Sequence, residues 1–240
     1  MGREVPRLAA RLMRAFLSII VPALNEAGQI VAMLTRLAVL RQAGAQVILA
    51  DGGSTDQTVA LALPLVDLVV HAPRGRALQM NAGAAQASGA ALLFLHADTA
   101  LPEQADKLIA AALDKQVWGR FDITLTGTHR MLPVIAAMMN WRSRLSGIAT
   151  GDQAIFVRRD AFEKLAGYAP IALMEDLELS RRLKKMSPPA CLRERVISSG
   201  RRWEKHGVWR TIVLMWRLRL AYFCGADPHA LAVAYGYLPR

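Results

Sequence analysis

The sequence of 240 residues has few of the features that mark secreted or membrane-spanning proteins. Its only two cysteines, Cys191 and Cys224, support no disulfide framework and do not have the spacing of metal ligands. No run of about 18 uncharged apolar residues occurs, so no segment is predicted to span a bilayer. Residues 1–16 carry four arginines but no apolar core or small-residue cleavage site, and we predict a basic leader there rather than a signal peptide. These absences favour a reducing, cytoplasmic location.

Acidic residues are also scarce near the C-terminus, where the positive charge collects. Twelve Lys or Arg but only two Glu lie between Arg181 and Arg219, and the formal net charge of the chain is +11. A solvated basic face explains this pattern, and so does a surface for an anionic membrane or a phosphorylated substrate. No recognisable nucleic-acid-binding module accompanies the charge, so nucleic acid is not a predicted partner.

Residues 201–240 mix tryptophans, arginines and aliphatic residues at roughly helical spacing. We predict a basic amphipathic helical segment there. Its apolar side faces either the domain, with the arginine stems lying along the surface, or a membrane whose head groups bind the arginines. In the second case the protein sits peripherally on the inner face of the membrane.

The first hundred residues alternate between β-branched apolar runs and segments with apolar residues at helical spacing. Strands this apolar, when helices separate them, indicate a parallel sheet covered on both faces. We therefore predict an α/β fold over residues 17–200, in which a mostly parallel central sheet is flanked by helices. The predicted strands are 17–23, 46–51, 67–72 and 90–98, and the predicted helices are 28–43, 54–63 and 75–87.

Polar residues follow each of these four strands. They are Asn25 and Glu26, residues 51–54, Arg74 and Arg76, and His96 and Asp98. Ligands of such sheets bind at the carboxyl ends of the strands, so we predict a binding site there. The glycine-rich motifs of dinucleotide-binding folds and P-loops are absent.

Six motifs occur in the order seen in glycosyltransferase family 2: "SIIVPALNEAGQI", "LADGGSTDQT", "GRALQMNAGAAQASG", "LLFLHADT", "GDQAIFVRRDAFEKLAGY" and "MEDLELSRRL". Over residues 17–186 the chain resembles a short bacterial member of that family, which has a GT-A fold. The "FLHADT" stretch is similar to the small transferases of arsenosugar-type pathways. The resemblance implies inverting transfer of a sugar from a nucleotide-diphosphate sugar, most often a UDP-sugar, to a hydroxyl acceptor.

The resemblance also implies which residues hold the donor. In the family, the loop after the first strand wraps the nucleotide, which corresponds to Pro22, Ala23 and Glu26 here. Ala97 is also expected to contact the nucleotide. Asp51 bonds the base in the family, although D-G-G is also turn chemistry and an Asx-turn is the alternative. Arg76 and Asn81, beside the helix after the third strand, reach the nucleotide or the diphosphate, and a plain surface role is the alternative for Arg76.

A divalent metal, Mg²⁺ or Mn²⁺, is the cofactor that the resemblance implies. The family has a D-x-D motif where this chain has "HAD", and the last carboxylate, Asp98, is the predicted metal ligand. The alternative for Asp98 is a helix cap before Leu101 and Pro102. His96 replaces the usual aspartate, and no metal role is carried over to it. His206 stands where related transferases place a late metal or diphosphate ligand, and a surface histidine is the alternative.

The catalytic and acceptor residues come from the last two motifs. Gly151, Asp152 and Gln153 precede a short predicted strand in the part of the family that borders the acceptor. Asp176 matches the catalytic base, and Glu175 helps to orient the site. An acidic pair in a first helical turn is also favoured by the helix dipole alone. The acceptor is expected to be a hydroxyl on a molecule that is lipid-linked or phosphorylated, as the basic C-terminal segment suggests.

Two other functions remain as alternatives. A sugar nucleotidyltransferase also uses an α/β sheet and a metal carboxylate, but it usually has a glycine-rich basic loop after the first strand, and "PALNEAG" is not one. A non-catalytic module that binds a nucleotide sugar or a partner would be expected to lack Asp98 and Asp176.

Overall fold

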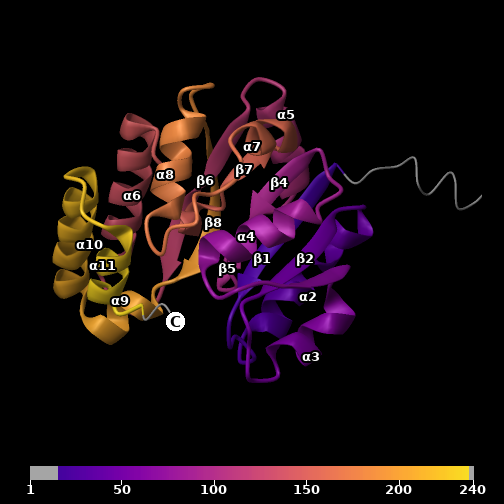
Figure 1. The fold of residues 1–240 in the computed structure, drawn as a ribbon, viewed down its shortest axis with the longest axis horizontal. Coiled ribbons are helices and arrows are strands. Elements are labelled where there is room, and N and C mark those ends of the chain that lie inside the picture. The colour runs from indigo at the N-terminus through magenta and orange to yellow at the C-terminus, as the bar shows by residue number, and fades with distance from the viewer. Residues whose placement is uncertain (1–15, 238–240) are drawn as a thin grey trace, which may run out of the picture.

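The computed structural model describes residues 16–237, in which an eight-stranded sheet is flanked by helices (Figure 1). The predicted leader 1–16 lies outside the described residues apart from Phe16, and so do residues 238–240. The strands, in the order of the sheet, are β3 (Leu68–His71), β2 (Gln46–Asp51), β1 (Leu17–Ala23), β4 (Ala91–Phe94), β7 (Phe156–Arg158), β6 (Trp118–Thr126), β8 (Ala190–Ser199) and β5 (Thr99–Ala100).

Helices connect the strands and continue beyond the last of them. They are α2 (Ile30–Gln42), α3 (Thr58–Ala62), α4 (Arg76–Ala85), α5 (Ala105–Leu113), α6 (Leu132–Ser146), α7 (Arg159–Lys164), α8 (Glu175–Leu183), α9 (Arg201–His206), α10 (Val208–Phe223) and α11 (Pro228–Ala234). Two short 3₁₀ helices, η1 (Leu63–Leu65) and η2 (Gly151–Gln153), complete the described elements.

The half of the sheet that contains β3, β2, β1 and β4 is parallel throughout, as the alternating pattern of the sequence predicts. β1 and β2 coincide with the predicted strands. β4 is shorter than predicted and ends at Phe94. The chain turns after it, and the N–H of Thr99 donates a hydrogen bond to the carbonyl of His96. His96 and Asp98 therefore lie in a turn beyond the strand rather than within it.

The other half of the sheet is mixed in direction. β7 runs antiparallel to both β4 and β6, β8 runs parallel to β6, and β5 closes the edge antiparallel to β8. Because β7 lies between β4 and β6, it joins the two halves of the sheet. The predicted fold class, a mostly parallel sheet with helices on both faces, is confirmed.

The side chains of the central strands alternate between two apolar cores. Ile19 and Val21 belong to one core, together with residues of α2, α5 and α6. Ile20, Ile48 and Phe94 belong to the other, with residues of α4, α7 and α8. This two-sided burial is the reason that these strands read as continuous apolar runs.

The predicted C-terminal helical segment is present as α9, α10 and α11, beside α6 and α8 in Figure 1. Leu218 of α10 and Leu231 of α11 pack against Met174 and Leu177 at the start of α8. Within residues 16–237, no helix combines the length and the apolar character needed to cross a bilayer. The division into residues 17–200 and 201–240 stays a prediction.

Candidate active site

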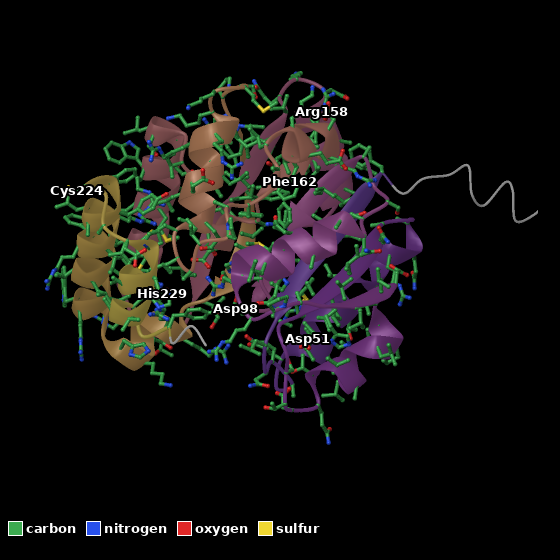
Figure 2. All side chains as sticks on the ribbon, in the orientation of Figure 1. Asp51, Asp98, Arg158, Phe162, Cys224 and His229 are labelled. Carbon is green, nitrogen blue, oxygen red and sulfur yellow. The ribbon has the colours of Figure 1, made fainter. Side chains whose placement is uncertain are left out.

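A cavity of about 800 Å³ lies at the carboxyl ends of β1 and β4. It is bounded by the first turns of α4 and α8, by η2, and by α6, α9 and α10. Figure 2 shows Asp51 and Asp98 in the lower part of the view, at one end of the strands, and Arg158 at the top, at the opposite end. The cavity is within the size range of small-molecule sites, which is roughly 300–1,000 Å³.

Most of the predicted site residues line this cavity. They are Pro22, Ala23, Glu26, Arg76, Ala97, Asp98, Gly151, Asp152, Glu175 and Asp176. The fold therefore brings together side chains from five separate segments of the sequence. Asp51, Asn81, Gln153 and His206 are not part of the lining.

Asp51 holds a turn at the end of β2. Its carboxylate accepts hydrogen bonds from the backbone N–H groups of Gly53 and Ser54, each at 3.1 Å, and lies 3.3 Å from Nδ1 of His71. These are the contacts of the alternative interpretation, an Asx-turn. A base contact for Asp51 stays a prediction.

The other three residues outside the lining have different surroundings. The side-chain amide of Asn81 donates to the carbonyl of Tyr168 at 2.8 Å and accepts from its N–H at 2.9 Å. Gln153 is buried and forms a capping box with Thr150 at η2. His206 is exposed at the end of α9. Their predicted ligand roles also stay predictions.

Two carboxylates, Glu26 and Asp98, line the cavity near the ends of β1 and β4 and lie close enough to interact electrostatically. Burial, reinforced by the charge of Asp98, raises the pKa of Glu26. The alternative for Asp98, a helix cap, has no helix to serve, because α5 begins only at Ala105 with Gln104 as its N-cap. Asp98 is therefore a carboxylate in a cavity, without a capping role.

His96 connects the end of β4 to η2. Its Nδ1 lies 3.1 Å from Oδ1 of Asp152, and its side chain is only 11% exposed. The ring also lies directly against Gly151, where an added Cβ would be 2.4 Å from Nε2 of His96. A side chain at this position would therefore displace the imidazole.

The acidic pair at the start of α8 is held by the backbone. Met174, the N-cap residue, has a φ of 71°, a left-handed conformation that is rare for residues other than glycine. Asp176 accepts hydrogen bonds from the N–H of Gly151 at 2.7 Å and from its neighbour Leu177 at 2.8 Å. The carboxylate of Asp176 is thus fixed between α8 and η2, which a simple dipole role would not require.

The same environment favours the protonated forms of both acids. Burial, reinforced by Asp176, raises the pKa of Glu175 to about 7. Burial also raises the pKa of Asp176, although its two backbone donors oppose this change. Perturbed carboxylates in a cavity are typical of catalytic sites.

Three residues with roles in the cavity were not found from the sequence. Gln79 is buried, and its Nε2 donates to the carbonyls of Ala23 and Ala50 at 2.7 and 2.9 Å, which holds the ends of β1 and β2 together. Arg142 of α6 and Arg219 of α10 also line the cavity. Arg142 Nη2 and Arg219 Nε are buried without a hydrogen-bond partner. No local signal in the sequence indicated that either arginine lies at a cavity.

Comparison with solved structures supports the fold. TarS residues 1–349 from S. aureus superpose with a TM-score of 0.60 at 17% identity, over 76% of this chain and 60% of that one. Mannosyltransferase PcManGT from Pyrobaculum calidifontis, in complex with GDP-Man and Mn²⁺, gives a TM-score of 0.63 at 19% identity, over 94% and 70% of the two chains. Glucosyl-3-phosphoglycerate synthase from Mycobacterium tuberculosis, with Mn²⁺, UDP and glucosyl-3-phosphoglycerate, gives 0.59 at 21% identity, over 95% and 87%.

This chain thus spans about 60% of the length of the TarS structure. At these identities the likeness shows the fold alone, and it confirms the predicted GT-A-like arrangement. No curated protein matched the sequence.

The family itself follows from the sequence match. The model of glycosyl transferase family 2 matches residues 18–166, which is more than half of the chain and includes β4, η2 and all of β1 except its first residue. The predicted enzyme class, a glycosyltransferase, is the class of this family. The chain belongs to glycosyl transferase family 2.

Proposed function

We propose that the protein transfers a sugar from a nucleotide-diphosphate sugar, with UDP as the expected nucleotide, to an acceptor hydroxyl with inversion at the anomeric carbon. The observation that carries this proposal is the convergence of Asp98 and Asp176 on one cavity. One carboxylate lies in the turn after β4 and the other in the first turn of α8.

The donor is assigned to the parallel half of the sheet. Pro22, Ala23, Glu26 and Ala97 line the cavity where β1 and β4 end. Two of the similar structures contain GDP-Man or UDP, which supports a nucleotide-sugar donor for this chain. Arg76 also lines the cavity, and its positive charge is suited to a diphosphate.

The residues present fit a divalent cation. Glu26 and Asp98 place carboxylate oxygens near one another, and hard cations prefer such ligands. Among residues 16–237 no group of three or more His, Cys, Asp or Glu is arranged to hold a metal. Mg²⁺ commonly binds through one or two carboxylates, waters and substrate phosphates, so Asp98 with a diphosphate is a suitable set. When bound, such a cation would neutralise charge on the departing diphosphate.

Asp176 is the proposed general base. It removes the proton of the acceptor hydroxyl, the oxygen forms a bond to the anomeric carbon, and the bond from that carbon to the diphosphate breaks. The hydrogen bond from Gly151 keeps this carboxylate oriented toward the acceptor side. Glu175, adjacent and buried, helps to set the local charge.

No observation favours the two alternatives. Both Asp98 and Asp176 are present and line the cavity, whereas a non-catalytic module was expected to lack them. The family match is to glycosyl transferases rather than to nucleotidyltransferases. The arsenosugar-type subgroup, a lipid-linked or phosphorylated acceptor, and a peripheral membrane position stay predictions.

The test is calorimetric titration of the protein with UDP in the presence and absence of Mn²⁺. We expect tighter binding with Mn²⁺, and we expect Asp98→Asn to remove that dependence while circular dichroism stays unchanged. Asp114→Asn, an exposed acid after α5, is the matched control and should behave like the wild type. Metal-dependent affinity that persists in Asp98→Asn would refute the assignment of Asp98.

A further inference from the structure

Helix α6 presents an apolar stripe to solvent. Val134, Met138, Trp141 and Leu145 are all exposed, although they are large and apolar. Their spacing of three and four residues places them on one face of the helix. The opposite face is buried through Leu132, Ile135 and Ala136. The exposed stripe therefore has no partner within the described residues.

Helix α10 presents a second stripe of the same kind. It consists of Trp209, Val213, Trp216, Leu220 and Phe223, again spaced by three or four residues. Trp141 of α6 is 66% exposed, and Trp209 and Trp216 are 68% and 63% exposed. Single exposed apolar residues are ordinary, but two aligned stripes indicate an interaction surface.

The two stripes border one opening. Met138 and Trp141 of α6 and Met215 and Trp216 of α10 all line the cavity that contains Asp176. Residues of the stripes thus form both the outer surface and the wall of the site. Figure 1 shows α6 and α10 on the same side of the molecule, away from the half that contains β1, β2 and β3.

The charges on these helices have a single sign. α6 and α10 contain five arginines and no acidic residue. Arg210 and Arg217 are exposed, and each follows a tryptophan of the stripe directly in sequence. Arg142 and Arg219 line the part of the cavity between α6 and α10, which we call the cleft. One guanidinium nitrogen of each, Nη2 of Arg142 and Nε of Arg219, has no hydrogen-bond partner among the described residues. A second copy of this face would be repelled by these charges, whereas an anionic surface would be attracted.

We propose that α6 and α10 dock on an anionic membrane, and that the cleft between them admits a lipid acceptor whose anionic head group reaches Arg142 and Arg219. Tryptophans are enriched at membrane–water interfaces, and arginine can bury its stem while its guanidinium binds a lipid phosphate. This arrangement would deliver a lipid-borne hydroxyl to Asp176 without removing the hydrocarbon chain from an apolar environment. The identity of the acceptor rests on the proposed function, but the docking does not.

Co-sedimentation of the full chain with vesicles tests the docking. We expect binding to phosphatidylcholine vesicles that contain phosphatidylglycerol at low salt, and release at high salt because salt screens the arginines. Arg210→Gln with Arg217→Gln should lower the partition coefficient by roughly 10- to 30-fold. Trp141→Ser with Trp216→Ser should lower it by at least roughly tenfold through lost apolar contact.

A matched control removes exposed apolar residues elsewhere. Val39→Ser with Leu63→Ser changes side chains on α2 and η1 that are 73% and 63% exposed, and it should leave the partition coefficient unchanged. Circular dichroism confirms that each variant is folded. The docking would be overturned if the wild-type protein stayed in the supernatant at low salt. It would also be overturned if the partition coefficient of the control fell as much as that of the variants in α6 and α10.

Tryptophan fluorescence tests the cleft, since Trp141 and Trp216 line it. We expect dodecyl phosphate to bind more tightly than inorganic phosphate, and Arg142→Gln to weaken dodecyl phosphate by about tenfold or more, as for a lost charged contact. Equal affinity for the two probes would overturn the lipid assignment. The titration with UDP and Mn²⁺ is independent: its failure would overturn the proposed donor chemistry while vesicle binding stands.

Discussion

Replacement of Glu175 by glutamine should make the ligand-free protein more stable at alkaline pH. Glu175 is only 6% exposed, and burial together with Asp176 raises its pKa from the ordinary 4.5 to about 7. The folded protein therefore keeps a proton that the unfolded chain releases between these two values. The free energy of unfolding consequently falls as the pH rises through this range.

The size of the effect follows from the two pKa values. A tenfold difference in proton affinity corresponds to about 1.4 kcal/mol, so the range from 4.5 to about 7 corresponds to roughly 3 kcal/mol at most. Glu175→Gln removes the ionisation and keeps the shape of the side chain. We expect it to exceed the wild type in stability by roughly 1–3 kcal/mol at pH 8, and by much less near pH 5.

Urea unfolding without metal or nucleotide measures this difference at both pH values. Glu103→Gln, an exposed acid before α5, is the control and should differ little from the wild type at either pH. The reasoning would be refuted if the free energies of unfolding of Glu175→Gln and the wild type differed by the same amount at pH 5 and at pH 8. Such a result would mean that the substitution acts through packing or hydrogen bonding rather than through ionisation.

Two further outcomes are expected. Asp176→Asn should bind UDP normally but turn over roughly 10²–10⁴-fold more slowly, as expected for a lost general base; a loss of less than about tenfold, with the true acceptor, would instead favour a structural role. Gly119→Ala should destabilise the protein by about 1–3 kcal/mol in thermal or urea unfolding, because the new Cβ would lie 2.5 Å from the carbonyl oxygen of Ala190. Gly28→Ala, where no atom lies within 4 Å of the added Cβ, is its control, and equal stability of the two variants would contradict this packing argument.

The parallel half of the sheet could be predicted because its signals are local. β1 and β2 are continuous apolar runs between helical segments, and their bounds agree with the sequence analysis. The end of β4 could not be placed as well, because Leu95 continues the apolar run although the strand ends at Phe94. The place of β7 between β4 and β6 depends on long-range pairing, which no short pattern encodes.

In the candidate site, too, residues marked by local motifs could be predicted and residues placed by long-range packing could not. Asp98, Glu175 and Asp176 were found because motifs of a known family mark them, and all three line the cavity. Arg142 and Arg219 were missed because each lies in an amphipathic helix where an arginine ordinarily faces solvent. Only the packing of α6 and α10 around the opening turns these two side chains toward the cavity.

The contact of His96 with η2 links the two substrates of the proposed reaction. The imidazole follows β4, near the donor residues, and it bonds Asp152 and touches Gly151, whose N–H holds Asp176. A donor that displaced the loop after β4 would therefore act on the proposed base through two contacts, His96 with η2 and Gly151 with Asp176. Coupling free energies are reciprocal, so whatever factor the donor applies to acceptor affinity, the acceptor applies equally to the donor. A coupling through His96 would therefore be the same whichever substrate binds first.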